Sequence, residues 1–189
     1  MENKELLKSY TQFLIENKYI TTLININEII NNYCNKKDKF SKDFIDAVHK
    51  VNEKYKGNVV FCGSFGLVLN GLLDRPIKDI DVLTFENYFV SPERELGNSG
   101  VFDVGNIEVL CFKEHINNIT IDTLYRNDSE NIKYSNIDFY NISIKVELPQ
   151  SAILFKKQYI ESNKDKSNFN TEKHLKDLED IKINLGLYY

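Results

Sequence analysis

The fold is decided by residues 59–85, which read VVFCGSFGLVLNGLLDRPIKDIDVLTF. Residues 58–63 form a short apolar run between turn residues, which is the pattern of a buried strand. Apolar residues then recur at helical spacing from Phe65 to near Asp74. Residues 79–85 begin with alternation of acidic and apolar side chains, which is typical of a second strand. This stretch therefore predicts a strand, a helix and a strand, in that order.

Polar residues at the joints of this unit favour metal-assisted chemistry on phosphate. Gly63 lets the backbone approach a ligand closely, and Ser64 adds a hydroxyl where the following helix presents its N–H groups to an anion. Asp79 and Asp81 are two residues apart on a strand, so both side chains point to one face. Two neighbouring carboxylates stay ionised only beside a cation, and Mg²⁺ or Mn²⁺ suits them. The pattern indicates phosphoryl or nucleotidyl transfer.

Residues 62–64 (CGS) and 79–82 (DIDV) together resemble the signature of the nucleotidyltransferase superfamily. That group shares a catalytic core with DNA polymerase beta, tRNA-CCA-adding enzymes and antibiotic nucleotidyltransferases. Arg75, ahead of the first Asp, is similar to an arginine of the small bacterial and phage members. The resemblance implies a mixed-sheet core, two Mg²⁺ ions on the two aspartates, and an NTP whose β- and γ-phosphates contact Gly63 and Ser64.

The same resemblance implies a third carboxylate on a later strand. We place it at Glu108, which stands between apolar residues in NIEVLCF, after the hairpin dipeptide Gly105-Asn106. Asp122, in ITIDTLY, fits nearly as well, and Asp103 is a further alternative. If none of these acids lies beside the first two, the chain would bind a nucleotide without turning it over.

Charged residues on both sides of the core complete the expected site. Arg75 and Lys78 precede the carboxylates and are expected to contact the triphosphate or the acceptor, with a solvated turn as the alternative. The closing helices resemble those of the small family members through Lys156 and residues 173–177, KHLKD. We expect Lys156 to reach toward phosphate, with an ordinary surface lysine as the alternative, and Asp177 to hold Lys156 or Lys173 in place.

The whole sequence predicts an α+β protein with a mixed sheet, organised as one compact unit. Residues 1–57 form a helical segment with helices at 3–18, at 22–34 and from the N-cap Ser41 onward. Residues 58–148 form the nucleotidyltransferase-like core, and residues 149–189 form two closing helices packed on that core. Further strands of the core are expected at 100–112 (two strands), 118–125 and 139–148.

Composition narrows the class of protein. The 189 residues include 24 basic and 28 acidic side chains, a net charge of −4. This balance weakens broad nucleic-acid binding, which needs a basic face, but leaves a local basic groove open. Cys34, Cys62 and Cys111 are widely spaced, which predicts no zinc site or disulfide framework. Cys62 and Cys111 each stand in an apolar run, which predicts buried free thiols. A polar start, unlike a signal peptide, and the lack of a long apolar run predict a soluble cytoplasmic protein that does not span a membrane.

We therefore expect an NTP-dependent nucleotidyltransferase that transfers an NMP group to a hydroxyl acceptor. The base of the NTP is open, and the acceptor is a small molecule, an RNA 3′ end or a protein. The alternative is a non-catalytic nucleotide-binding or protein-interaction module, for example a partner in a toxin–antitoxin pair. A plain α+β domain is a second alternative, because a Gly-Ser after a strand is usually only a turn and a helix cap.

Overall fold

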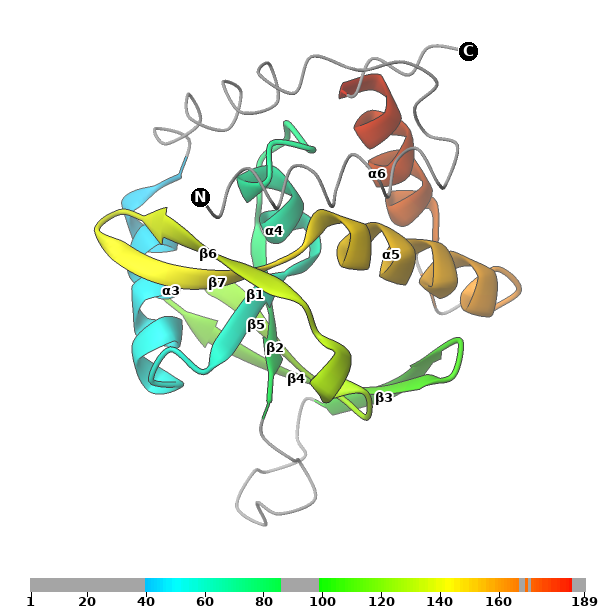
Figure 1. The fold of residues 1–189 in the computed structure, drawn as a ribbon, viewed down its shortest axis with the longest axis horizontal. Helices are drawn as coiled ribbons and strands as arrows, with labels where there is room; N and C mark the ends of the chain where they lie inside the picture. Colours follow the sequence, from blue (N-terminus) through cyan, green and yellow to red (C-terminus); the bar gives the residue numbers. More distant parts are fainter. Residues whose placement is uncertain (1–39, 86–98, 167–168, 170, 185–189) are drawn as a thin grey trace.

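The structure, a computed structural model, describes residues 40–85, 99–166, 169 and 171–184 (Figure 1). Its main elements in chain order are α3 Lys42–Lys54, β1 Val59–Cys62, α4 Gly63–Leu69, β2 Asp79–Thr84, β3 Ser99–Val104, β4 Ile107–Ile116, β5 Ile119–Arg126, β6 Tyr134–Phe139, β7 Ile142–Glu147, α5 Pro149–Asn163 and α6 Thr171–Asn184. The predicted α+β class is confirmed. The helices expected at 3–18 and 22–34, and Cys34, lie outside the described residues. Among the described helices, none is long and apolar enough to span a membrane.

The strands form one seven-stranded mixed sheet in the order β3-β4-β5-β2-β1-β7-β6. β2 pairs in parallel with β5, and β1 pairs in parallel with β7, whereas the other neighbours are antiparallel. The predicted strand–helix–strand unit therefore lies at the centre of the sheet. Its helix α4 ends at Leu69, earlier than the expected end near Asp74, and Gly71 follows in the left-handed conformation at φ 73°. Glycine after a C-cap is a common helix stop.

Turn residues decide where the outer strands begin and end. Gly105, at φ 62°, joins β3 to β4 as the hairpin dipeptide predicts. The strand expected over 139–148 is present as β7, but it begins later, at Ile142, because Tyr140 and Asn141 form the turn between β6 and β7. Both have positive φ, 44° and 71°. Two consecutive positive-φ residues are the mark of a two-residue hairpin turn that matches the twist of its strands.

Aromatic side chains fill the core between α3, α4 and one face of the sheet. Phe44 from α3, Phe61 from β1 and Phe65 from α4 are each at most 2% exposed. The ring of Phe65 packs edge-on against Phe44 and Phe61, with centroids 5.1 and 5.8 Å away. The helix α3 begins at the predicted N-cap Ser41, whose hydroxyl accepts the Phe44 N–H at 3.2 Å. This packing holds the start of α4 against the end of β1.

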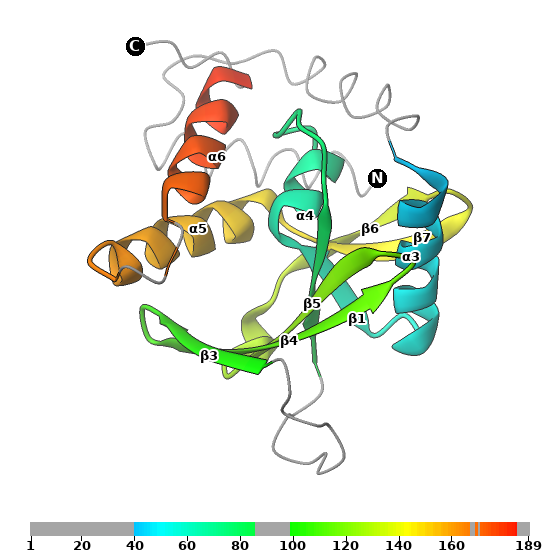
Figure 2. The same ribbon diagram turned by 180° about the vertical axis from the view of Figure 1, so that it is seen from behind.

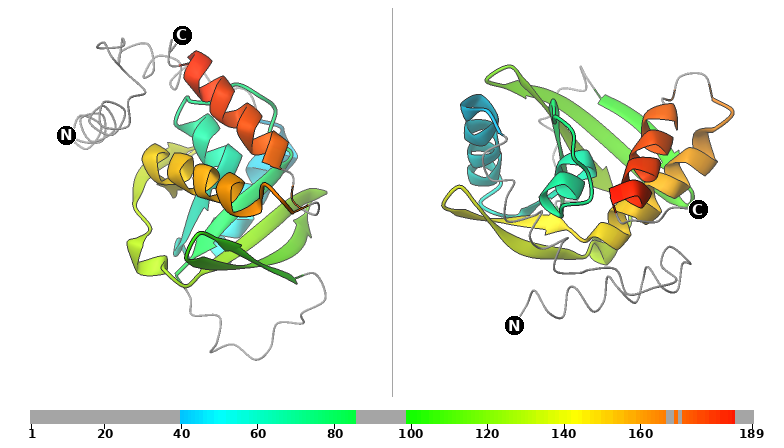
Figure 3. Two further views of the ribbon diagram at one scale, coloured as in Figure 1. Left: turned by 90° about the vertical axis from the view of Figure 1, so that its right-hand side faces the viewer. Right: turned by 90° about the horizontal axis from the view of Figure 1, so that it is seen from above.

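The other face of the sheet carries the acidic residues of β2. Ile80 is completely buried in the aromatic-rich core, and since side chains alternate along a strand, Asp79 and Asp81 point to the opposite face. The helices α5 and α6 lie together on the other side of the molecule from α3 (Figures 2 and 3). They pack on α4 through an apolar cluster that includes Leu67, Ile153 and Ile181. The two C-terminal helices predicted from the sequence therefore border the acidic face.

Candidate functional site

A cavity of about 710 Å³ opens between the acidic face of the sheet and the helices α5 and α6. Its lining includes Gly63, Ser64, Asp79 and Asp81, the residues that the sequence places at the joints of the central unit. It also includes Lys156, from α5. Because residues far apart in the chain converge here, this cavity is the candidate functional site.

Three aspartates rise from one face of two neighbouring parallel strands. Asp79 and Asp81 lie on β2, and Asp122 lies on β5 directly beside Asp81 in the strand register. All three line the cavity. Neighbouring strands are about 4.8 Å apart, so the Asp81 and Asp122 side chains stand next to each other. Carboxylate oxygens gathered in this way are the ligands that hard divalent cations prefer.

The electrostatics of Asp81 favour a bound cation. Burial, followed by the negative charges of Asp79 and Asp122, raises the pKa of Asp81 to about 7. The positive charges of Lys156 and Lys173 lower the pKa but offset only part of this rise. A carboxylate whose ionised form is disfavoured to this degree gains most from a neighbouring divalent cation, which lowers its pKa again.

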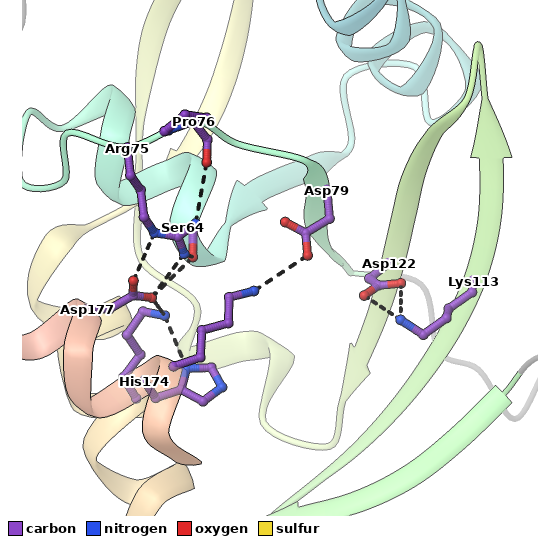
Figure 4. Close-up of polar contacts among 10 residues, drawn as sticks. Ser64, Arg75, Pro76, Asp79, Lys113, Asp122, His174 and Asp177 are labelled. Carbon is purple, nitrogen blue, oxygen red and sulfur yellow. Dashed lines mark hydrogen bonds and ion pairs between the residues drawn. The ribbon is translucent and has the colours of Figure 1, made fainter. Parts of the chain in front are cut away.

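Two lysines neutralise Asp79 and Asp122, and Figure 4 shows the two ion pairs. Lys113, on β4, donates to both carboxylate oxygens of Asp122 at 2.8 Å, and Lys173 Nζ lies 3.6 Å from Asp79 Oδ2. Within the described residues, no three His, Cys, Asp or Glu side chains are arranged so that they could hold a metal ion as they stand. A metal bound by Asp122 would therefore replace Lys113, whose side chain is 54% exposed and can turn into solvent.

Buried ion pairs behind Ser64 tie α6 to α4 and α5 (Figure 4). Asp177, 2% exposed, accepts hydrogen bonds from Lys156 Nζ at 2.8 Å and from Arg75 Nε at 2.9 Å. Arg75 also donates to the Ser64 hydroxyl at 2.6 Å. Burial acts to raise the pKa of Asp177, but the charges and hydrogen bonds of Lys156 and Arg75 lower it overall. The ionised Asp177 thus fixes the position of the Lys156 ammonium.

His174 stands beside this network on α6. Its Nδ1 lies 3.2 Å from Lys156 Nζ. Burial, together with the positive charge of Lys156, lowers the pKa of His174 to about 4. The imidazole is therefore neutral near pH 7 and can accept a hydrogen bond from the ammonium. Lys156 is held by one carboxylate and one imidazole, both of them from α6.

The structure does not bring Glu108 to the other two acids, and the reason is strand alternation. On β4, Lys113 faces the cavity because it pairs with Asp122. Glu108 is an odd number of residues away on the same strand, so it points to the opposite face. The alternative Asp103 pairs with Glu108 across β3 and β4 and shares that face. Of the three later acids that the sequence offered, the structure therefore brings Asp122 to Asp79 and Asp81, and it places the preferred Glu108 on the opposite face.

The predicted phosphate-binding cations divide into two groups. Lys156 lines the cavity, as expected. Lys78 is exposed and lies outside the cavity lining, so the structure does not join it to the site. Arg75 also lies outside the lining, and its guanidinium group contacts Asp177 and Ser64. Arg75 is therefore a positioning residue that orients Ser64 from behind.

Several lining residues were not expected from the sequence. Phe102, Tyr159 and Phe169 form an aromatic side of the cavity, and Arg126 and Glu147 lie elsewhere in its lining. Glu147 is 4% exposed, and burial raises its pKa to about 7 although Arg126 Nη1 lies 3.8 Å away. Only Arg126 could have been found from the sequence, because it lies four residues after Asp122 on β5 and therefore on the same face of the strand. The others come from separate elements that no sequence period connects.

Comparisons of this chain with protein-family models, with curated proteins and with solved structures gave no match. The resemblance to nucleotidyltransferases accordingly rests on the sequence alone, chiefly on residues 62–64 and 79–82.

Proposed function

We propose that this chain is a metal-dependent nucleotidyltransferase that transfers an NMP group from an NTP to a hydroxyl acceptor. One observation carries the proposal: Asp79, Asp81 and Asp122 share one face of the parallel strands β2 and β5, in a cavity that Lys156 also lines. Nucleotidyl transfer needs carboxylates for a divalent metal and positive charge for the phosphates in one place. The cavity supplies both.

The donor set fits Mg²⁺ or Mn²⁺ better than a thiophilic metal. The three aspartates offer only oxygen ligands. Two thiols also line the cavity, but burial, followed by nearby carboxylates, raises the pKa of Cys62 and raises that of Cys111 to about 12. In the metal-free protein both thiols are therefore neutral, and the aspartates are the better ligands for a hard cation. When bound, the metal would neutralise the triphosphate and lower the pKa of the acceptor hydroxyl.

The residues of the chain would bind and orient the two substrates. Gly63 and Ser64 would contact the β- and γ-phosphates, and Lys156 would pair with them from α5. In the reaction, the acceptor oxygen bonds to the α-phosphorus as the bond to the bridging oxygen breaks, and pyrophosphate leaves. Asp122 would accept the hydroxyl proton as general base, because it is a carboxylate on the cavity face.

A non-catalytic nucleotide-binding module, such as a toxin–antitoxin partner, is the second candidate. The ion pair between Lys113 and Asp122 favours it, because the Lys113 ammonium occupies the carboxylate that a metal would need. The two functions predict different behaviour of Lys113→Met. In an enzyme, removing this competitor lowers the Mg²⁺ concentration needed for transfer. In a binding module, neither the wild type nor the variant transfers nucleotide.

The proposed function is tested with the four NTPs labelled at the α-phosphate. Each is incubated with the protein, Mg²⁺ and a cell lysate, which is then separated into small molecules, RNA and protein. Label that moves into one fraction with the wild type, and not with Asp81→Asn, supports the enzyme and identifies the class of acceptor. Binding of an NTP by calorimetry without any transfer of label would favour the non-catalytic module.

A further inference from the structure

Three aromatic side chains form one wall of the cavity. Phe102 of β3, Tyr159 of α5 and Phe169 pack edge to face, with centroid separations of 5.8 Å (Phe102–Tyr159), 5.9 Å (Tyr159–Phe169) and 6.4 Å (Phe102–Phe169). We call these three rings the aromatic wall. The neutral imidazole of His174 lies against its end, 4.4 Å from the Tyr159 ring. His174 therefore contacts both the aromatic wall and Lys156.

The strand register connects the aromatic wall to the carboxylates. Leu124 follows Asp122 by two residues on the cavity face of β5, which is about 7 Å along the strand. Leu124 pairs with Cys111, and Cys111 pairs with Gly100. This row separates the acids from Phe102, which lies two residues beyond Gly100 on the same face of β3. An apolar strip therefore leads from the metal-binding end to the aromatic wall.

The strip leaves space for a flat group. Gly100 has no side chain, and a Cβ built on it would meet no atom within 4 Å. Leu83 and Leu124 also line this part of the cavity, and neither offers a hydrogen-bonding side chain. Cys111 adds a protonated thiol, a weak donor. A ring on this strip would be held by apolar contact and stacking, with little hydrogen bonding to its edge.

We propose that the aromatic wall binds the nucleobase of the NTP by stacking, an inference that rests on the proposed function. The ligand class follows from one cavity that has carboxylates and cations at one end and aromatic rings at the other. A nucleoside triphosphate has the same division, because a charged triphosphate is joined to a planar ring. Recognition by stacking is tolerant of the base, so ATP and GTP should bind alike and more tightly than the smaller pyrimidine nucleotides.

The test is calorimetric titration of two probes in Mg²⁺. One probe is ATP with a methylene bridge between the α- and β-phosphates, which cannot be transferred, and the other is inorganic tripolyphosphate. Phe102→Ala should weaken the nucleotide about tenfold or more and leave tripolyphosphate unchanged. Phe102→Tyr, which keeps the ring, should bind both probes like the wild type. If Phe102→Ala fails to fold by circular dichroism, Tyr159→Leu on α5 should give the same selective loss.

Phe112→Ala is the matched control. Phe112 lies on β4 between Cys111 and Lys113, which line the cavity, so its ring points to the opposite face and packs on Tyr125 at 5.5 Å. This variant should bind both probes like the wild type.

Three results would overturn the inference. In the first, Phe102→Ala weakens both probes equally. In the second, Phe102→Ala weakens neither probe, and if it also lowers transfer of the α-label from ATP to the lysate, the aromatic wall belongs to the acceptor. In the third, wild-type protein binds neither probe in Mg²⁺, which would overturn the proposed function as well. Comparison with tripolyphosphate thus shows whether a variant loses binding of the phosphates or binding of the base.

Discussion

Gly63 leaves room for the carboxylate of Asp81: a Cβ on residue 63 would lie 2.8 Å from the Asp81 Cγ and 3.0 Å from its Cβ. Gly63 also has φ +60°, a conformation that glycine adopts without strain. The two residues meet because Cys62, at the end of β1, pairs with Asp81 on β2. The turn proposed to bind phosphate and the strand proposed to bind metal are therefore packed directly against each other.

This close approach predicts that Gly63→Ala is far more harmful than an equivalent change elsewhere. Gly57 provides the control, because it has a similar φ of +70° but open space around its Cβ position. Gly57→Ala should cost only the conformational strain, about 1–2 kcal/mol. Gly63→Ala should cost a further 1–3 kcal/mol, roughly, because the new methyl overlaps Asp81. Urea unfolding measures both, and equal losses would show that the contact with Asp81 does not constrain residue 63.

The assignment of the third carboxylate predicts opposite results for two acids. Asp122→Asn should abolish nucleotide transfer, because Asp122 shares the cavity face with Asp81. Glu108→Gln should keep near-full activity, because Glu108 lies on the opposite face of the sheet. Transfer of an α-labelled phosphate, measured beside circular dichroism as a check of folding, decides between them. An inactive Glu108→Gln with an active Asp122→Asn would restore the original assignment.

The buried network around Asp177 predicts a large loss of stability when its charge is removed. Asp177→Asn leaves Lys156 and Arg75 without their shared carboxylate, and breaking a buried ion pair costs about 3–5 kcal/mol. The control is Glu161→Gln, which breaks an exposed ion pair with Lys164. It should leave the urea midpoint unchanged, because solvent screens exposed pairs. If Asp177→Asn were as stable as Glu161→Gln, the network would not hold α6 in place.

Glu147 predicts that part of the stability is lost as pH rises. Burial raises its pKa from 4.5 to about 7, so the folded protein binds this proton more tightly than the unfolded chain does. The stabilisation that protonated Glu147 gives the folded protein is full below about pH 4.5, and it disappears as pH rises through about 7. The loss is on the order of 1–3 kcal/mol. Asp81, whose pKa is also raised to about 7, acts in the same direction.

Glu147→Gln should therefore flatten the dependence of the free energy of unfolding on pH. Urea unfolding at about pH 5 and about pH 8 gives the slope for the wild type and the variant. The control is Glu114→Gln, which removes an exposed carboxylate paired with Lys54 and should keep the wild-type slope. A Glu147→Gln variant as pH-dependent as the wild type would contradict the buried, proton-binding carboxyl.

The features predicted correctly from the sequence are local ones. The alternation of Asp79, Ile80 and Asp81 places the two acids on one face wherever the strand lies in a sheet. The polar residue before the apolar spacing of α3 indicates a cap, and Ser41 caps that helix. Such patterns depend only on neighbours within one helical turn or one strand, so they hold whatever the order of the strands in the sheet.

The features that could not be predicted depend on strand order and register. Glu108 stands between Ile107 and Val109, and Asp122 stands between Ile121 and Thr123. These local contexts are too alike to decide between the two acids, and only the pairing of β5 with β2 places Asp122 beside Asp81. The aromatic wall joins Phe102 to Tyr159 across a large separation in the chain. Contacts of this kind are set by the packing of whole elements, and no local period carries them.

The central claim, that the three aspartates hold the divalent metal, is tested most directly by titrating Mn²⁺ and following its electron paramagnetic resonance. The titration is done with the methylene analogue of ATP present. We predict that the wild type and Glu108→Gln bind Mn²⁺ equally, whereas Asp81→Asn and Asp122→Asn bind it about tenfold or more weakly. Wild-type affinity in both aspartate variants would show that the metal is held elsewhere and would contradict the proposed site.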